Sequence, residues 1–393
     1  MSGKNKGKKD GARKSRSKTT QDSNSTTKEE DFSDIPKNKV IVARWRVIQK
    51  LGSGGCGAVY KVEDLHAPGT LRAMKLEAGD AGAMGVLKLE KKVLDKLNEI
   101  PINSLKMYDF GRRTAYSFVV MSLCGADLLN LAAKARNKFA PGSLSKIGIM
   151  CLSAIKHIHD IGFVHRDVKP GNFVAASAVP GRDARIIWLL DFGLVRSFIV
   201  KDKGGQQELK KRKNREKVQL RGTLRYCSVN THLRKEQGRV DDLISLLNVL
   251  QAINGGLPWD GLKKEKEIQE MKQKLDDRDI FHNSPPEFPH ICKYLRTLQA
   301  EQRPDYQLVH MFFKEQVDRD GTTFLDRFEW EKEQDVQTCI ESTETERSMF
   351  KTEPDNILQY RVYPMVSPDA FEPSALQRQV EAVSPACSFN GFN

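Results

Sequence analysis

The sequence predicts an α+β fold with two lobes, in which a small antiparallel β-sheet with one main helix precedes a larger, mainly helical lobe. Three observations predict it. Strand-like runs separated by glycines come first, helical spacing of apolar residues dominates afterwards, and polar segments without periodicity lie at both ends. With 393 residues, of which 39% are hydrophobic, the chain can build a substantial core.

The smaller lobe is expected to begin near Arg44. Branched and aromatic residues alternate or cluster, as in strands, in 45-WRVIQKL-51, 57-GAVYKVE-63, 70-TLRAMKLE-77 and 116-YSFVVMSL-123. Between the last two runs, 86-VLKLEKKVLDKL-97 has helical periodicity, and one face carries Val86, Leu89, Val93, Leu94 and Leu97. An antiparallel sheet accompanied by one helix is therefore expected.

The later part of the chain is expected to be mainly helical. Residues 143–162 are apolar at helical spacing and end in Gly162, a common stop signal for helices. Further on, 186-IIWLL-190 has the continuous apolar pattern of a buried strand.

Both ends of the chain have a different composition. Residues 1–40 are rich in Lys, Ser, Thr, Gly and Asn, and they could bury too little to offset the entropy of ordering, so we expect a disordered basic tail. Its segment 4-KNKGKKDGARKSRSK-18 has the composition of a nuclear-localisation or polyanion-binding tail, and equally that of a merely solvating one. Residues 321–393 form a C-terminal extension that turns polar, with Ser-Pro at 367–368 and 384–385, and we expect it to be partly disordered.

Charge and cysteine content limit the class of protein. The 64 Lys and Arg against 51 Asp and Glu give a net charge of +13, which favours acidic partners such as phosphorylated protein, nucleic acid, microtubule-like surfaces or anionic lipid. The seven cysteines are scattered and lack Cys-x-x-Cys spacing, so neither a disulfide framework nor a zinc site is indicated. No run approaches the roughly 18 apolar residues of a membrane span. We expect a soluble monomer without membrane contact, located in the cytoplasm and, given the basic tail, also in the nucleus.

The first chemical motif is 52-GSGGCGAV-59, which matches Gly-x-Gly-x-x-Gly-x-Val between two strand-like runs. Glycine lets backbone amides approach phosphate oxygens because no Cβ intervenes. A glycine-rich hairpin is more often an ordinary turn, so the motif decides little by itself. Its strand–turn–strand setting argues against a dinucleotide-binding fold, in which the third glycine opens a helix.

The second motif is Lys75 on the following strand, with Glu90 fifteen positions later in the expected helix. A buried lysine stays charged only when it is paired, and Glu90 could orient it toward the α and β phosphates of a nucleotide. Taken singly, each residue reads as an ordinary surface charge. The glycine-rich loop just before them favours the functional interpretation.

The third motif, 165-HRDVKPGN-172, is highly specific. Asp167 can accept or orient the proton of a substrate hydroxyl, Lys169 can steady a transferring phosphoryl group, and Asn172 can ligate a metal. His165 is expected to pack and to hydrogen-bond as scaffold.

The fourth motif, 191-DFG-193, follows the buried strand 186–190. Asp191 would hold Mg²⁺ that bridges the phosphates. Asp-Phe-Gly can also be a simple turn, but its order and its distance from Asn172 favour the metal site.

In this combination the sequence resembles the eukaryotic protein kinases over residues 41–320. Within them, the segments 165-HRDVKPGNF-173, 222-GTLRYCSVNTH-232, 241-DDLISL-246, 257-LPW-259 and 303-RPDYQL-308 resemble the casein kinase one superfamily. The segments 44-RW-45, 227-CSVN-230 and 304-PDYQLV-309 resemble its tau-tubulin kinase-like branch. The resemblance implies a kinase fold with a smaller lobe at 41–121, a hinge at 121–125 and a larger lobe at 126–320. It also implies a serine/threonine kinase that acts on proteins with ATP and Mg²⁺.

The resemblance assigns roles to matching residues. The catalytic set is Lys75, Glu90, Asp167, Lys169 and Thr223, and the metal ligands are Asn172 and Asp191. Met121 is the gatekeeper at the adenine site. The residues expected around the nucleotide are Leu51, Gly52, Ser53, Gly54, Gly55, Cys56, Gly57, Val59, Ala73, Lys75, Met121, Ser122, Leu123, Cys124 and Asn172. Cys56 departs from the family, which usually has Phe there.

A second departure lies at 228-SVN-230, where most protein kinases have Ala-Pro-Glu, whose glutamate pairs with a distant arginine. Arg303 is the match of that arginine. The resemblance makes the substitution a mark of a branch with active members, and it leaves Asp242 as the expected brace for the backbone of the catalytic loop.

The segment between 191-DFG-193 and 222-GT-223 contains Ser197 and otherwise no Ser, Thr or Tyr. A phosphate that would pair with Arg166 therefore has no evident attachment point, and we predict activity without phosphorylation of this segment.

The same segment is strongly basic. Among its charged residues are Lys201, Lys203, Lys210, Lys211, Arg212, Lys213, Arg215 and Lys217 against Asp202, Glu208 and Glu216. It is either a solvated mobile loop or a selector of acidic or phosphorylated substrates. Arg225 matches a position that contacts anions in casein kinase one relatives. Glu270 stands where a lysine of that anion site is expected, which weakens the case for phosphorylated substrates.

Two rival functions follow from other classes of protein. A pseudokinase scaffold would bind nucleotide and partners without transfer, but the intact Lys75, Asp167, Asn172 and Asp191 argue against it. A nucleic-acid-binding protein would account for the net charge, but the sequence has no groove-reading motif, and the basic tail lacks aromatic residues for base stacking.

Overall fold

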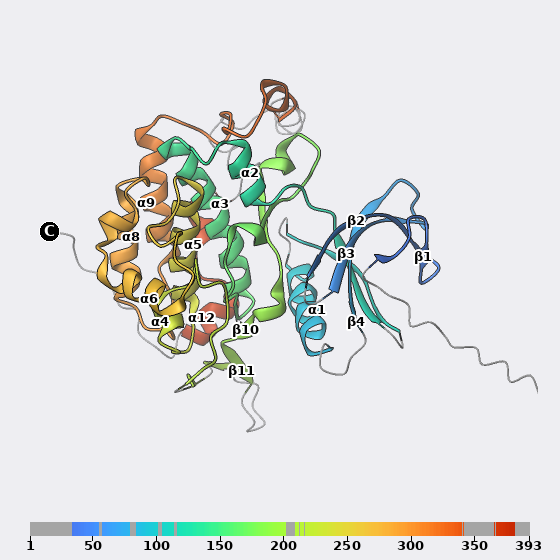
Figure 1. The fold of residues 1–393 in the computed structure, drawn as a ribbon, viewed down its shortest axis with the longest axis horizontal. Helices are drawn as coiled ribbons and strands as arrows, with labels where there is room; N and C mark the ends of the chain where they lie inside the picture. The colour runs from blue at the N-terminus through green and yellow to red at the C-terminus, as the bar shows by residue number, and fades with distance from the viewer. Residues whose placement is uncertain are drawn as a thin grey trace, which may run out of the picture. The chain divides into compact units, whose positions relative to one another are not determined.

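The computed structural model describes residues 34–54, 57–78, 84–100, 104–113, 116–201, 209–211, 213–215, 217–339, 341, 365 and 367–381. Figure 1 shows a β-sheet, helix α1 beside it, and a larger helical part beyond α1. The predicted two-lobed α+β architecture is confirmed.

One antiparallel sheet forms the smaller lobe. In the described part of the chain its strand order is β1-β2-β3-β4-β6-β5. The strands are β1 (Val40–Ile41), β2 (Trp45–Gly54), β3 (Gly57–Asp64), β4 (Leu71–Ala78), β5 (Met107–Arg112) and β6 (Tyr116–Ser122). β5 was not anticipated, because its sequence MYDFGR is mixed in polarity and its side chains are only partly buried at the edge of the sheet.

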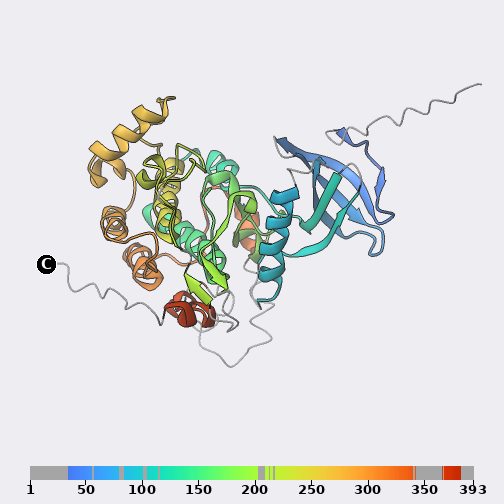
Figure 2. The same ribbon diagram turned by 90° about the horizontal axis from the view of Figure 1, so that it is seen from below.

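The two faces of this sheet are buried differently. Buried and partly buried residues alternate along β3, as expected when successive side chains point to opposite faces. One face packs into a separate apolar cluster around Trp45 and Tyr60, both fully buried. Helix α1 (Met84–Asn98) contacts β5 and β6 and lies between the sheet and the helical lobe (Figure 2).

Helices build the larger lobe. They are α2 (Leu128–Lys134), α3 (Pro141–Asp160), α4 (Val229–His232), α5 (Arg239–Ile253), α6 (Glu265–Lys274), α7 (Asp277–Ile280), α8 (Glu287–Arg296), α9 (Tyr306–Arg319) and α12 (Ala375–Glu381), and residues 333–339 are also helical. α3 is central, because it packs on both α5 and α9 and nearly all its side chains are buried. It ends at Asp160, and Gly162 follows with φ +88°, the left-handed conformation that the sequence predicted at this stop.

Short strand pairs and turns connect the helices near the site. The strand pairs are β7 (Phe163–Val164) with β10 (Arg196–Ser197), β8 (Phe173–Ala175) with β9 (Ile187–Leu189), and β11 (Ile199–Lys201) with β12 (Leu209–Lys211). The 3₁₀ turns are η2 (Pro170–Asn172), η3 (Arg182–Arg185), η4 (Phe192–Leu194) and η6 (Pro368–Phe371). Among the residues that the structure describes, none of the helices has the length and apolar character of a membrane span.

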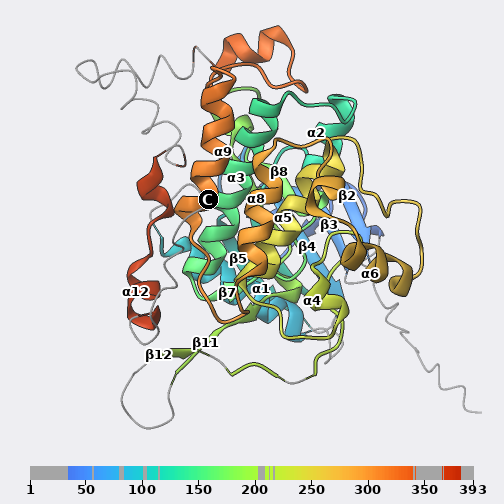
Figure 3. The same cartoon turned by 90° about the vertical axis from the view of Figure 1, so that its left-hand side faces the viewer.

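Described parts of the C-terminal extension pack against the helical lobe, which their composition did not indicate. Arg185, 1% exposed, forms a two-pronged ion pair with Glu331 at 2.6 and 2.7 Å. Phe371 is fully buried and stacks on His310 of α9, and Figure 3 shows α12 beside this lobe. The extension therefore contributes to the core of the larger lobe.

Candidate active site

Lys75 and Glu90 meet between the sheet and α1. β4 carries Lys75 and α1 carries Glu90, and Lys75 Nζ donates to Glu90 Oε2 at 2.8 Å. Burial lowers the pKa of Lys75, but the carboxylates of Glu90, Asp191 and Glu77 outweigh it, and the pKa is raised. Lys75 is therefore held as an ammonium, as the sequence predicted for a paired lysine.

Glu77 is an acidic neighbour that the sequence analysis missed. It lies two residues after Lys75, on the same face of β4, and its Oε1 is 3.7 Å from Lys75 Nζ. Burial raises the pKa of Glu77, and Lys75 opposes this effect. The period-two spacing on a strand was the available signal.

Three predicted residues contact Asp167 of the catalytic loop, residues 165–172. Lys169 Nζ donates to Asp167 Oδ2 at 2.6 Å, and Thr223 Oγ1 donates to Asp167 Oδ1 at 2.7 Å. Asn172 Nδ2 donates to the backbone oxygen of Asp167 at 2.9 Å. Both oxygens of the Asp167 carboxylate are thus oriented by residues that the sequence singled out.

Asp242 braces this loop, as predicted. The backbone N–H groups of His165 and Arg166 donate to its two oxygens at 2.6 and 2.8 Å, and His159 Nε2 lies 2.8 Å away. Burial raises the pKa of Asp242, but the hydrogen bond and charge of His159 and the His165 contacts more than offset it, so the pKa is lowered. Arg166 has φ +68°, so two anchored amides hold the loop in a conformation that non-glycine residues rarely adopt.

Asp191 lies at the entrance to η4, on the side of Lys75. Its Oδ1 is 3.8 Å from Lys75 Nζ, its side chain is 49% exposed, and its φ of +65° is in the left-handed region. The next residue, Phe192, is buried and meets the His165 ring edge-on at 6.0 Å between centroids. His165 also contacts the backbone oxygen of Leu190 at 2.9 Å, so it packs and hydrogen-bonds as predicted.

Asn172 and Asp191 fit a hard cation in the chemistry of their donors. The Asn172 amide nitrogen is used by Asp167, which leaves its oxygen as the ligand atom, and Asp191 offers a half-exposed carboxylate. In the described ranges no cluster of three or more His, Cys, Asp or Glu stands ready to hold a metal ion. The pair therefore suits an ion such as Mg²⁺, which takes much of its coordination from water and substrate phosphates.

Most of the predicted nucleotide-contacting residues lie on β2, β3, β4 and β6 or directly after β6. Gly52, Ser53 and Gly54 end β2 and Gly57 starts β3, while Gly55 and Cys56 lie outside the described residues. At Gly57, φ is +136° and a Cβ would lie 1.9 Å from the oxygen of Leu76, so only glycine fits.

The remaining predicted contacts lie on adjacent strands and after β6. Val59 pairs with Lys75 across β3 and β4, and Ala73 pairs with Met121 across β4 and β6. Leu51 is on β2, Ser122 ends β6, and Leu123 and Cys124 follow it. Burial raises the pKa of the Cys124 thiol to about 12, so it is a neutral group there.

Comparison with known proteins decides the family. Residues 45–314 match the protein kinase domain. The chain belongs to the protein kinase family.

Relatives agree with this placement. The kinase is 38% identical to a serine/threonine-protein kinase of Caenorhabditis elegans over 294 residues, which cover 75% of this chain and 84% of the relative. A serine/threonine-protein kinase of Dictyostelium discoideum is 36% identical over 74% of this chain, and the match spans 57% of that longer relative. An inactive tau-tubulin kinase of Caenorhabditis elegans is 34% identical over 63% of this chain and 87% of its own length.

Residues 222–228, here called the substrate segment, follow the activation segment (residues 194–221) and are anchored by α5. Ser228, which caps α4, donates to Asp241 Oδ1 at 2.5 Å, and the N–H of Gly238 donates to Asp241 Oδ2 at 2.7 Å. The residues 228–230 that replace Ala-Pro-Glu are thus held by Asp241, a contact that the sequence analysis missed.

The guanidinium of Arg225 is already paired in this kinase. Its guanidinium pairs with Asp260 at 2.5 and 2.7 Å and lies over the Tyr226 ring. An anion that bound Arg225 would have to share it with Asp260. Arg303 also has a partner that was not predicted. Its Nε donates to Gln377 Oε1 of α12 at 2.7 Å.

Proposed function

We propose that this chain is an active serine/threonine protein kinase that transfers the γ-phosphate of ATP to Ser and Thr hydroxyls of proteins. The observation that carries the proposal is the arrangement of Asp167. Thr223 and Lys169 each hold one of its carboxylate oxygens, and Asp242 fixes the backbone of the loop that presents it. Phosphoryl transfer needs mainly positioning and charge stabilisation, and this arrangement can supply both.

The residues divide the chemical work. Asp167 orients the substrate hydroxyl and accepts its proton, while Lys169 beside it offsets negative charge on the transferring group. Lys75, fixed by Glu90, binds the phosphates of ATP. Asn172 and Asp191 would hold Mg²⁺, which when bound would neutralise charge on the phosphate oxygens.

We further propose that this kinase is active without phosphorylation of its activation segment. A carboxylate of the chain itself lies in the basic cluster of that segment: Glu236, 7% exposed, pairs with Arg215 at 2.7 Å and with Arg196 at 3.1 Å. Arg166, whose pKa is lowered to about 10 by burial and by Arg196, donates to the backbone oxygen of Leu194. Glu236 thus supplies an anion to this cluster, a role that phosphorylation has in other switches.

The finer assignment rests on sequence. The motifs 222–232 and 303–308 support a place in the casein kinase one superfamily and its tau-tubulin kinase-like branch, and one relative is named as a tau-tubulin kinase. The basic side chains of the activation segment support a preference for acidic or phosphorylated substrates, including cytoskeletal ones. We also propose that the protein is a monomer of the cytoplasm and nucleus.

The rival proposal is a nucleotide-binding scaffold without transfer, which the relative named as inactive favours. Radiolabel transfer from ATP to casein or an acidic peptide separates the two. Phosphatase-treated protein from bacteria should transfer label, and Asp167→Asn should reduce the rate by about 100- to 10,000-fold because the proton acceptor is lost. Equal signal from both proteins would favour the scaffold. Activity that appeared only after an upstream kinase modified the activation segment would contradict the proposed independence.

A peptide array tests the substrate preference. We expect higher rates on peptides with acidic or phosphorylated flanks than on matched neutral peptides. Equal rates on both sets would show that the basic segment is only a solvated loop.

A further inference from the structure

The backbone of the substrate segment is held from outside at every carbonyl between residues 224 and 227. Each of the four oxygens accepts a hydrogen bond from a side chain farther along the chain. Lys272 Nζ donates to Leu224 O and Cys227 O at 2.7 Å each, Trp259 Nε1 donates to Arg225 O at 2.8 Å, and Asn248 Nδ2 donates to Tyr226 O at 2.9 Å. The segment therefore has a fixed backbone, although it is not a regular element.

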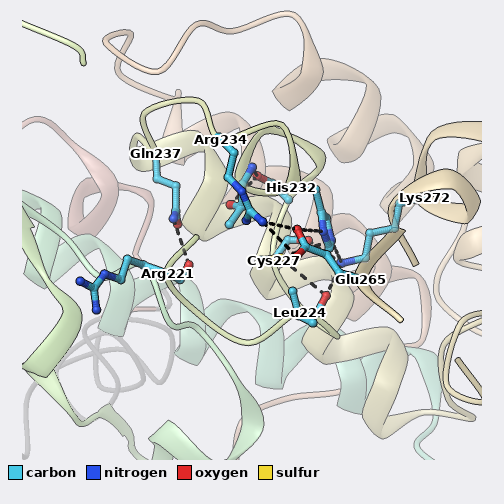
Figure 4. Close-up of polar contacts among 10 residues, drawn as sticks. Arg221, Leu224, Cys227, His232, Arg234, Gln237, Glu265 and Lys272 are labelled. Atoms are coloured by element: carbon cyan, nitrogen blue, oxygen red, sulfur yellow. Dashed lines mark hydrogen bonds and ion pairs between the residues drawn. The ribbon is translucent and has the colours of Figure 1, made fainter. Parts of the chain in front are cut away.

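Lys272 supplies two of these four bonds. Figure 4 shows its side chain reaching from α6 into the group formed by Leu224, Cys227 and His232. Lys272 is only 3% exposed, its ammonium lies 3.3 Å from His232 Nε2, and it sits over the Trp259 ring at 5.0 Å. A lysine has three donors and no acceptor, and these neighbours satisfy it; among the residues that the structure describes, no carboxylate forms an ion pair with it.

The rest of α6 explains why this lysine stands out. Of its residues, Ile268 and Lys272 are buried, one turn apart on one face. Lys274, two positions later, is 78% exposed, and Glu270 is 49% exposed. Burying a lysine costs free energy unless its charge is well solvated, so the two carbonyl contacts are what hold it in place.

Lys272 remains mostly cationic near neutral pH although it is buried. Burial lowers the pKa of Lys272 to about 8, and Cys227 opposes this effect. Burial and Lys272 lower the pKa of His232 to about 4, while burial raises that of Cys227 to about 11, so both neighbours are neutral. Glu265 lies 3.7 Å from His232 Nδ1 and is paired with Arg234 at 2.9 Å.

The contact with Leu224 lies next in sequence to a residue that binds the Asp167 carboxylate. Leu224 follows Thr223, whose hydroxyl is bound to Asp167 Oδ1. We propose that Lys272 is a positioning residue for the protein substrate: its ammonium fixes the carbonyls of Leu224 and Cys227 and thereby the surface against which the acceptor peptide lies. This inference rests on the proposed kinase function.

The test compares Lys272→Met, which keeps chain length but has no donors, with Lys272→Arg and with the exposed control Lys274→Met on the same helix. Initial rates are measured with varied protein substrate at saturating ATP, and with varied ATP at saturating protein substrate. We expect Lys272→Met to lower kcat/KM for the protein by about tenfold and to leave the KM for ATP within about twofold. Lys272→Arg should recover part of the loss, and Lys274→Met should match wild type.

A purely structural role would give a different result. It would lower thermal stability and affect the parameters for ATP and protein alike, which would overturn the proposal, as would unchanged kinetics in Lys272→Met. If that variant does not fold, Lys272→Gln is tested in its place. A changed KM for the protein substrate beside an unchanged KM for ATP supports the proposal. Unchanged KM values for both substrates reject it. Failure of the kinase function itself is recognised separately, because wild type would then transfer no label.

Discussion

The catalytic loop and the substrate segment are held by two adjacent carboxylates at the start of α5, and the two braces differ in kind. Asp242 accepts hydrogen bonds from the backbone N–H groups of His165 and Arg166. Asp241 accepts hydrogen bonds from the hydroxyl of Ser228 and the backbone N–H of Gly238. Both are almost fully buried, at 2% and 1% exposure. Their pKa values nevertheless move in opposite directions, downward for Asp242 and upward for Asp241.

The difference comes from the partners. Burial raises the pKa of each carboxylate, but Asp242 also faces His159 and the loop amides, which favour its charged form more strongly than burial opposes it. Asp241 has the hydroxyl of Ser228 and the N–H of Gly238, and these do not outweigh burial and the charge of Asp242. The catalytic loop is thus anchored by a carboxylate that gains from being ionised, and the substrate segment by one that does not.

The strongest test of this contrast is Asp242→Asn. The amide cannot accept at both positions that the carboxylate serves, so an N–H of the catalytic loop or His159 loses its acceptor. We expect the free energy of unfolding to fall by about 3 kcal/mol and the rate of phosphoryl transfer to fall by at least about 100-fold, because a small displacement of Asp167 is costly. Urea denaturation and radiolabel transfer measure the two effects. If Asp242→Asn lowered stability and rate no more than Asp241→Asn does, the proposed difference between the two carboxylates would be wrong.

Asp241→Asn should act on substrate binding more than on stability. Because burial already disfavours its charged form, we expect the free energy of unfolding to change by less than about 1 kcal/mol. The displaced substrate segment should lower kcat/KM for the protein by about tenfold and leave the KM for ATP nearly unchanged. Steady-state kinetics with each substrate varied in turn measure this split. An equal rise in the KM for ATP and the KM for the protein would show that Asp241→Asn disturbs the ATP site as much as the substrate segment.

The pH dependence of stability should carry opposite contributions from the two carboxylates. The folded pKa of Asp242 lies below its usual 3.8, so its contribution is present above pH 3.8 and is lost as the pH falls through the folded value. The folded pKa of Asp241 lies above 3.8, so its contribution is present below pH 3.8 and is lost as the pH rises through the folded value. A tenfold change in proton affinity on folding corresponds to about 1.4 kcal/mol of stability.

Thermal unfolding between pH 2 and 7 checks these signs. Asp242→Asn should lose less stability than wild type on acidification below pH 4. Relative to wild type, Asp241→Asn should gain stability as the pH rises above 4. Parallel curves for all three proteins would mean that neither carboxylate changes its proton affinity on folding.

The motifs of the candidate site were predictable because each occupies a short stretch of the sequence. Phosphate binding and proton transfer require particular residue types, and Lys75, Asp167, Asn172 and Asp191 are readable by type and order. In the structure Lys75 lies 3.8 Å from Asp191, and Asn172 donates to the backbone oxygen of Asp167. The two-lobed fold was predictable for a similar reason, since strand and helix periodicities change along the chain.

The braces were less predictable because they join distant residues of unexpected type. Lys272 is 48 positions from Leu224, and its helix EKEIQEMKQK reads as an exposed charged surface in which a lysine is normally solvated. Glu236 lies outside the activation segment that it neutralises, and Asp241 was overshadowed by its neighbour Asp242. Contacts of this kind depend on tertiary packing, and single-sequence patterns do not encode which buried polar group meets which.

The smallest expected effect separates stability from activity. Gln377 is fully buried and accepts a hydrogen bond from Arg303 at 2.7 Å, outside both halves of the site. Gln377→Ala should lower the free energy of unfolding by about 1 kcal/mol, since Arg303 loses one acceptor, while the exposed neighbour Arg378→Ala should cost less. Urea denaturation and steady-state kinetics are measured on the same preparations. If Gln377→Ala lowers kcat/KM for the protein as Asp241→Asn does, a general loss of stability would account for both, and the substrate segment would need no brace of its own. Unchanged kinetics at a comparable loss of stability would instead assign the effect of Asp241 to the position of the substrate segment.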